Sequence, residues 1–320
     1  MNLTKIIISI SALVFITLLG CREDSANDYI IIPDNATEED SIKEDIDNEY
    51  SSLFLTESDE DGEDGEEDYL TEEEINDDFM PFWYRRCHRE SRDITIHIED
   101  GIADVTLITG LEGYFMIDVD GDRRCGKKEI QDTAVRYAVF ERNTIDEKKN
   151  GKGHWKLKEL SPLEIQLQNE EKRTILILKV TALVDGETRF MVDDSAMMFG
   201  VPSELPHFSP GEVVKLTAKI ENTNEDGSER ESYVYLHHSR RVLQPGMEKH
   251  RRRRHLIFDD GENGGDEVAG DNIFTGTYTI RNAAGFHHVG VDVLDAEMFE
   301  DETTQNYNSM AWVIPYIIEK

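Results

Sequence analysis

Cysteine, proline and basic residues are scarce in this chain of 320 residues. It contains 3 cysteines and 8 prolines. So few cysteines exclude a small scaffold that depends on many disulfides. The chain also lacks a run of about 20 apolar residues, the length that a membrane-spanning helix needs. Only 34 Lys and Arg stand against 68 Asp and Glu, and the resulting net charge of −34 argues against nucleic-acid binding, because phosphates would be repelled.

The start of the chain is what organises the rest. A secretory signal peptide is indicated by Lys5, the mostly apolar run 6–19 and a small residue before the expected cleavage site. The ending Leu18-Leu19-Gly20-Cys21 resembles the lipobox of bacterial lipoproteins. That resemblance implies cleavage before Cys21, a diacylated Cys21 thiol and an acylated new amine, with palmitate among the expected acyl groups. We therefore expect residues 1–20 to be removed. The alternative is an ordinary secreted protein in which Cys21 is incidental.

The three residues after the expected cut bear on location. Arg22-Glu23-Asp24 places no Asp directly after the cysteine, which resembles lipoproteins sorted to the outer membrane. A basic residue followed by two acids also resembles the surface-export signal of some Gram-negative lipoproteins. We expect a lipid-anchored protein of the outer membrane or cell surface, and a periplasm-facing position stays open. Several acyl chains anchor a protein firmly, because each buried CH₂ contributes about 0.8 kcal/mol.

Acidic residues are concentrated in residues 21–80. This block carries a net charge of −23, and its segment 57–68 is almost entirely Asp, Glu and Gly. Such a composition buries too little apolar surface to offset the entropy of ordering, so we expect an extended, disordered tether. Two short apolar islands, Ile30–Ile32 and Leu53–Leu55, interrupt it. The alternative is an acidic tail that binds cations or a partner.

Two cysteines remain if Cys21 carries lipid. An even number in an exported chain predicts a disulfide between Cys87 and Cys125. The alternative is two thiols, because the sequence does not show whether their Cα atoms come within about 7 Å.

The rest of the chain is dominated by short β patterns, which predicts an all-β fold of two β-sandwich domains. We expect an N-terminal β-sandwich over 81–203, with turns at Glu99–Gly101, Gly110–Gly113 and Asp185-Gly186. Its expected strands are Ile94–Ile98, Val105–Thr109, Tyr114–Val119, Val135–Glu141, Trp155–Leu160, Leu163–Leu167, Thr174–Val184 and Thr188–Val192.

Prolines and glycines near 200–210 mark the boundary to a second β pattern over 204–320. Six strands in about 110 residues fit an immunoglobulin-like sandwich. The stretch Phe258–Thr275 resembles the "DDG…GD…AGDG(I/V)(Y/F)T" loop of immunoglobulin-like domains in bacterial surface proteins, with Asn272 where Gly is usual. This resemblance bears on architecture more than on activity. The expected strands are Val214–Ile220, Tyr233–Leu236, His255–Phe258, Ile273–Ile280, Val289–Leu294 and Met310–Ile318.

Two acidic loops are candidate calcium sites. Asp118, Asp120, Asp122 and Glu129 occupy positions 1, 3, 5 and 12 of an EF-hand-like loop, in which oxygen ligands wrap a hard cation. Arg123 stands where that loop needs Gly, so the alternative is a solvated hairpin loop. The second candidate combines four carboxylates with a glycine-rich loop, and its alternative is ordinary turn chemistry. Its residues are Asp259, Asp260, Asp266 and Asp271.

A basic run, Lys249–His255, is a candidate anion site. Arg251, Arg252, Arg253 and Arg254 offer charge to phosphate, lipid headgroups or acidic polysaccharide. The alternative is an internally compensated strand edge that discourages aggregation.

Catalysis finds little support, because the sequence has no nucleophile elbow, zinc-protease motif or Walker loop. We therefore expect a non-catalytic lipoprotein with a structural, adhesion or ligand-binding role, whose partners are the membrane and an envelope protein or polysaccharide. The alternative is a carbohydrate-processing enzyme or its accessory module, since the many carboxylates would allow a glycosidase pair.

Overall fold

The computed structural model describes residues 38–54, 82–120, 124–143, 154–238, 253–281 and 284–320. They belong to one compact unit, Thr37–Lys320. The expectations for the signal peptide, for Cys21 and for residues 22–37 and 55–80 of the acidic block fall outside the described residues. Within the described ranges, no helix is long and apolar enough to cross a membrane.

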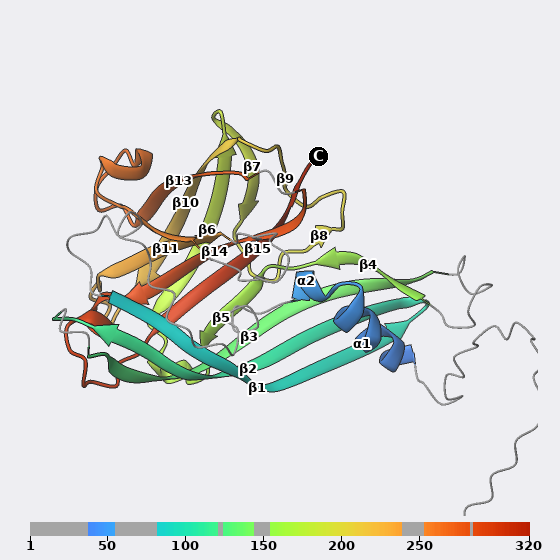
Figure 1. Ribbon diagram of the computed structural model, residues 1–320, viewed down its shortest axis with the longest axis horizontal. Helices are drawn as coiled ribbons and strands as arrows, with labels where there is room; N and C mark the ends of the chain where they lie inside the picture. Colours follow the sequence, from blue (N-terminus) through green and yellow to red (C-terminus); the bar gives the residue numbers. More distant parts are fainter. Residues whose placement is uncertain (1–37, 55–81, 121–123, 144–153, 239–252, 282–283) are drawn as a thin grey trace, which may run out of the picture. The chain divides into compact units, whose positions relative to one another are not determined.

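The unit is all-β, as the patterns predict, and consists of two sheets (Figure 1). The large sheet follows the order β1-β2-β3-β5-β15-β14-β11-β12, and all its pairings are antiparallel except the two-residue pairing of β9 with β15. Its strands are β1 (Phe82–Glu99), β2 (Ile102–Asp118), β3 (Gly126–Asn143), β4 (His154–Leu160), β5 (Leu163–Leu167), β8 (Phe199–Gly200), β9 (His207–Phe208), β11 (Ser232–His238), β12 (Arg253–Ile257), β14 (Gly285–Asp295) and β15 (Ser309–Ile318).

The small sheet is antiparallel throughout, in the order β13-β10-β6-β7. Its strands are β6 (Ile175–Val184), β7 (Glu187–Val192), β10 (Val213–Asn222) and β13 (Ile273–Thr279). Three short 3₁₀ helices lie between strands: η1 (Glu170–Lys172), η2 (Asn263–Gly265) and η3 (Ala296–Phe299).

One hydrophobic core joins the two sheets. Val214, Leu216 and Ala218 alternate along β10 and are buried against valines of β14 and aromatic residues of β15. Because successive side chains of a strand point to opposite faces, this alternation places one face of each sheet in the core. The period-two pattern of the sequence is therefore confirmed at the level of individual side chains.

Two of the three expected turns are confirmed. Asp100 and Gly101 have φ of 49° and 79° between β1 and β2, and Asp185 and Gly186 have φ of 52° and 82° between β6 and β7. Two successive positive φ values are typical of the type I′ turn, which matches the twist of a hairpin.

The third expected turn, Gly110–Gly113, is wrong, because β2 runs through it. A Cβ built on Gly113 would lie 2.1 Å from the carbonyl oxygen of Arg86 on β1. The glycine there permits close approach of a neighbouring backbone rather than a change of direction.

Strand pairing crosses the boundary expected near residue 203. β5 pairs with β15, and β6 pairs with β10, so each sheet contains strands from both sides of that position. β5, which pairs with both β3 and β15, and β6 therefore connect the two parts of the chain that the sequence assigns to separate domains.

The acidic block contains two helices, α1 (Glu38–Asn48) and α2 (Ser51–Phe54). Ile42, Ile46, Leu53 and Phe54 are buried in a core cluster with residues of β2, β3 and β4. Isoleucines four positions apart share one face of a helix, so a short acidic segment still presents an apolar stripe. The expectation of a disordered tether is wrong for residues 38–54.

Candidate functional site

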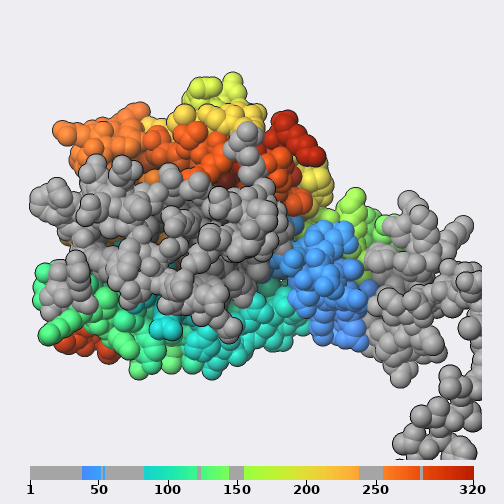
Figure 2. Space-filling model, viewed as in Figure 1, coloured from blue at the N-terminus to red at the C-terminus, as the bar shows by residue number. Residues whose placement is uncertain are grey.

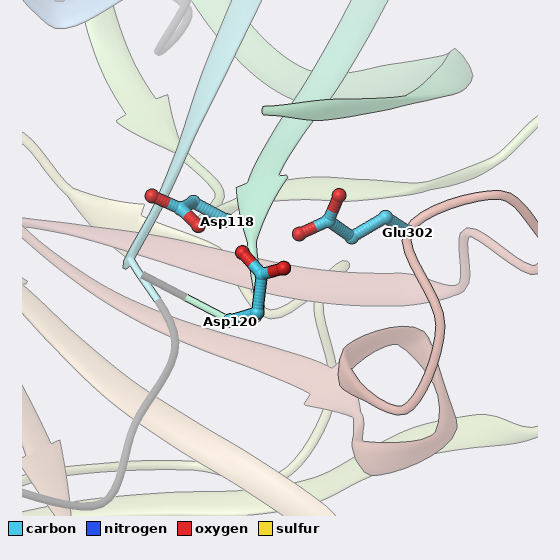
Figure 3. Close-up of side chains that lie close together, drawn as sticks. All are labelled: Asp118, Asp120 and Glu302. Carbon is cyan, nitrogen blue, oxygen red and sulfur yellow. The ribbon is translucent and has the colours of Figure 1, made fainter. Parts of the chain in front are cut away.

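Three carboxylates meet at the end of β2 (Figure 3). Asp118 is the last residue of β2, Asp120 follows it, and Glu302 comes from the loop between η3 and β15. One oxygen of each lies within 4.8 Å of one oxygen of each of the others. Asp118 is buried, Asp120 is exposed and Glu302 is intermediate, so the cluster is open to solvent on one side.

Backbone contacts fix Glu302 in this position. The backbone N–H of Val119 donates to Glu302 Oε1 at 2.7 Å. A Cβ built on Gly126 would lie 2.5 Å from both the carbonyl oxygen and the Cβ of Glu302. Only glycine leaves room for the loop to rest on the start of β3, so Gly126 helps to bring the third carboxylate to the other two.

Lys128 on β3 holds the loop that carries Glu302 through hydrogen bonds. Its buried ammonium donates to the carbonyl oxygens of Asp301 and Thr304 and to Asn306 Oδ1. Burial lowers the pKa of Lys128, against the opposing effect of the nearby Asp301 and Glu302 charges. Lys128 therefore holds the loop through two backbone carbonyls and one side-chain amide, while Glu302 accepts from Val119 through Oε1 and keeps Oε2 for a ligand.

The chemistry of this cluster suits a hard divalent cation. Calcium takes six to eight oxygen ligands, from carboxylates, carbonyls and water, and tolerates irregular geometry. If such a cation binds here, Asp118, Asp120 and Glu302 would supply part of its ligand set, and water would supply the rest. Hydrogen bonds from the backbone and side chain of Thr303 lower the pKa of the neighbouring Asp301 to about 2, so this carboxylate stays ionised even in mild acid.

The structure brings part of this predicted loop together, and the calcium site itself remains a prediction. Asp118 and Asp120 are brought together as expected, whereas Asp122 and Arg123 fall outside the described residues. Glu129 is exposed on β3 and is not part of the group; its backbone N–H donates to the side chain of Gln305. Glu302 was missed, because it lies more than 180 positions away in the sequence and no local pattern marks it.

The second acidic loop uses its carboxylates as turn acceptors. Asp259 accepts the backbone N–H groups of Gly270, Asp271 and Asn272 at 2.7–3.1 Å. Asp260 accepts those of Glu262 and Asn263, and Asp271 accepts that of Ile273.

Asp266 closes this second loop from within. It accepts the N–H of Gly261 at 2.7 Å and the hydroxyl of Thr275 at 3.5 Å. Asn272 has φ of 61°, as expected for Asn at a position where Gly is usual. Among the described carboxylates, those of this loop do not form a group like that at Asp118, so turn chemistry describes the loop better than cation binding.

The basic run lies largely outside the description. Arg251 and Arg252 precede the described part, and Arg253 and Arg254 begin β12 opposite His238 and His237. The anion site expected there remains a prediction.

Cys87 and Cys125 are not joined to each other by a disulfide, contrary to the expectation. Cys87 lies on β1 opposite Gly113, whereas Cys125 precedes Gly126, which pairs with Ile117 on the other side of β2. Cys125 stands at the level of Asp118, so two strand spacings and five residues of offset separate the cysteines by well over the 7 Å that a disulfide spans.

A buried polar cluster links β1 to the opposite part of the large sheet, and the sequence reasoning missed it. Arg85 Nη1 and Nη2 donate to the two oxygens of Asp292 at 2.5 and 2.9 Å, and His237 Nε2 lies 3.2 Å from Asp292 Oδ2. Arg85 Nε also donates to the hydroxyl of Tyr307, which donates to Asp132 at 2.8 Å.

Burial on its own raises the pKa of Asp292, but the charge of Arg85 and the hydrogen bonds from His237 and Arg85 outweigh it and hold that pKa well below its ordinary value. The guanidinium of Arg85 stays charged and donates to both oxygens of Asp292, so this cluster holds β1 and β14 together. It does not present a general base.

Comparison with known proteins adds no assignment: no protein-family model matches the chain, and no curated protein matches it.

Proposed function

We propose that this protein is a lipid-anchored lipoprotein of the bacterial outer membrane or cell surface, with a non-catalytic structural, adhesion or ligand-binding role. The observation that carries the proposal is the sequence Leu18-Leu19-Gly20-Cys21 directly after Lys5 and an apolar run. Cysteine at this one position explains how an acidic, polar chain is retained at a membrane.

The finer fold proposed is an immunoglobulin-like sandwich built from β6 and from β9 to β15. The strand order supports it. Consecutive strands β10 and β11, β12 and β13, and β13 and β14 lie in different sheets, while β11, β14 and β15 are neighbours in one of them. Such crossings between two packed sheets are typical of immunoglobulin-like topology. The glycine-rich loop that resembles bacterial surface modules connects β12 and β13.

A non-catalytic role is supported by how the described polar groups are used. The Asp292 carboxylate is paired with an arginine, and the carboxylates of the loop at Asp259 accept backbone N–H groups. The cluster at Asp118 is suited to holding a cation that stabilises the fold. We propose an envelope protein or a polysaccharide as the partner of the anchored body.

Mass spectrometry of the mature N-terminus tests the anchor. We expect the first residue to be Cys21 with acyl chains on its thiol and amine, and no peptide from residues 1–20. An unmodified Cys21 would contradict the proposal. A glycan panel then separates the roles: binding without turnover agrees with the proposal, whereas hydrolysis abolished by mutating one carboxylate would assign the protein to carbohydrate processing.

A further inference from the structure

The segment Glu38–Phe54, which comprises α1 and α2 and is called the strap below, covers a surface of the large sheet. Ile42, Ile46 and Leu53 are 0–1 % exposed. They pack in one cluster with residues that form the strap surface, namely Ala103, Val105, Phe140, Trp155 and Leu157. Figure 2 shows the strap, in blue, on the outside of the unit, with much of its other side open to solvent.

The strap also takes the place of a neighbouring strand. The backbone N–H of Trp155 donates to Asp45 Oδ2 at 3.1 Å, and that of Leu157 donates to the hydroxyl of Tyr50 at 3.3 Å. These N–H groups belong to β4, which pairs with β3 on one side and only with the two-residue β8 on the other. Side chains of the strap therefore satisfy donors that an edge strand would otherwise expose.

Arginines surround the strap surface. Arg92 pairs with Asp47 at 2.5 Å, and Arg142 pairs with Glu38. Arg136 is 1 % exposed and donates to the carbonyl oxygens of Leu53 and Val313. Within the described part of the chain, Arg136 has no carboxylate partner. The surface thus offers an apolar floor, two backbone donors and three guanidinium groups, which is the complement of an acidic amphipathic segment.

The sequence of α1 has this chemistry: EEDSIKEDIDN contains six acids, one lysine and two buried isoleucines. An 11-residue helix is marginal in water by itself, so it is helical because it is docked. Its two arginine pairs are partly exposed and are screened by salt. In the sequence, residues 55–81 separate the strap from β1, and a chain of that length spans at most about 90 Å at about 3.3 Å per residue.

We propose that the strap surface is an interaction surface for the strap of a second copy of this chain, so that neighbouring copies pair by exchanging straps. The strap of a second copy has the same sequence as the strap that occupies the surface, so it makes the same contacts. Exchange of an identical element is also a low-cost route to a dimer. In dilute solution the strap surface binds the strap of its own chain, because a covalently linked segment has a higher effective concentration than the strap of a second copy. Crowding of anchored copies on a membrane, which rests on the proposed lipoprotein function, favours exchange.

The test uses the full chain in detergent, where its outcome does not depend on acylation. Ile42→Asp/Ile46→Asp weakens the strap and leaves its surface intact. A labelled peptide of residues 37–55 should bind this variant at least tenfold more tightly than it binds the unaltered chain, measured by fluorescence anisotropy. A peptide that carries the same two substitutions is the matched control and should not bind. If the double Asp variant does not fold, Ile42→Ala/Ile46→Ala replaces it.

A cooperatively melting variant that does not bind the peptide would overturn the proposal. Sedimentation then identifies the occupant. Mixing the weakened variant with the unaltered chain at high concentration should give a dimer, because the intact strap of one copy reaches the vacant surface of the other. If the peptide binds but no dimer forms, a second copy is not the partner. The strap surface would then be a binding site for an acidic segment of another protein.

Discussion

Arg85 on β1 and Asp292 on β14 form a bidentate ion pair across 207 positions of sequence, with Nη–O distances of 2.5 and 2.9 Å. Four strands separate β1 from β14 in the large sheet if the path is followed through β2, β3, β5 and β15. The sheet must therefore curve until the inner face of β1 meets that of β14. Trp83 contributes to the same junction, because its Nε1 donates to the hydroxyl of Tyr235 on β11 at 3.2 Å.

Removing the arginine should be costly. Arg85→Met leaves Asp292 buried without its counter-charge, and breaking a buried ion pair in this way costs about 3–5 kcal/mol. We expect the free energy of unfolding, measured by denaturant titration, to fall by that amount. Arg189→Met is the matched control, because its pair with Glu212 is exposed and worth less than about 1 kcal/mol. Equal losses in the two variants would show that the Arg85 pair is not a structural clamp.

The same pair predicts acid sensitivity. The folded pKa of Asp292 lies below its unfolded value of about 3.9, so its stabilising contribution is present above pH 4 and is lost as the pH falls further toward the folded pKa. In Asp292→Asn this titration is absent. We expect unfolding free energy to decline less steeply below pH 4 in Asp292→Asn than in the unaltered protein, whatever the offset between them. Parallel declines would contradict this role for Asp292.

Gly126 should be intolerant of a side chain. Gly126→Ala places a Cβ 2.5 Å from backbone and side-chain atoms of Glu302, so the loop that carries Glu302 must move. We expect a loss of about 1–3 kcal/mol, as for other overpacked sites, measured as a lower melting temperature. Gly110→Ala is the control, because its new Cβ meets mainly the side chains of Ser91 and Glu90. A melting temperature unchanged by Gly126→Ala would mean that the loop is not held where the structure places it.

Calcium should act through the first acidic loop. At 100-fold above Kd, a ligand stabilises the fold by about 2.7 kcal/mol. For a unit of this size that is a melting shift of about 5–10 °C between EDTA and calcium buffers. Asp120→Asn should abolish the shift. Asp266→Asn should lower melting equally in both buffers, because Asp266 supports a turn. Identical melting of the unaltered protein in both buffers would remove the calcium site.

The sequence predicts strands well because burial has period two wherever one face meets a core. Along β10, Val214, Leu216 and Ala218 are fully buried, whereas Lys215 and Thr217 between them are only partly buried. The apolar run of β6 shows the limit of this reasoning: Leu176 is 51 % exposed, because β6 has strand neighbours on both sides but a core on only one face. Composition alone cannot distinguish a strand that is buried on both faces from a strand that is apolar on both faces but buried on only one.

Other features depend on contacts between distant segments. Acidic composition predicted disorder for residues 38–54, yet four buried apolar side chains and three arginines supplied by strands hold the helices in place. Glu302 joins Asp118 through a loop that rests on Gly126, and Cys87 is separated from Cys125 by an intervening strand. The position of Glu302 and the separation of the two cysteines leave no local signal in the sequence, whereas Ile42 and Ile46, four positions apart, are a local signal of an amphipathic helix.

Membrane fractionation of Cys21→Ser tests the central claim most directly, because the acyl chains are the one strong anchor that the sequence provides. The unaltered protein should pellet with the membranes, and Cys21→Ser should be recovered in the soluble fraction or in uncleaved precursor form without acyl groups. Cys87→Ser is the matched control and should pellet like the unaltered protein. A Cys21→Ser variant that is processed and still pellets with the membranes would contradict the lipoprotein assignment.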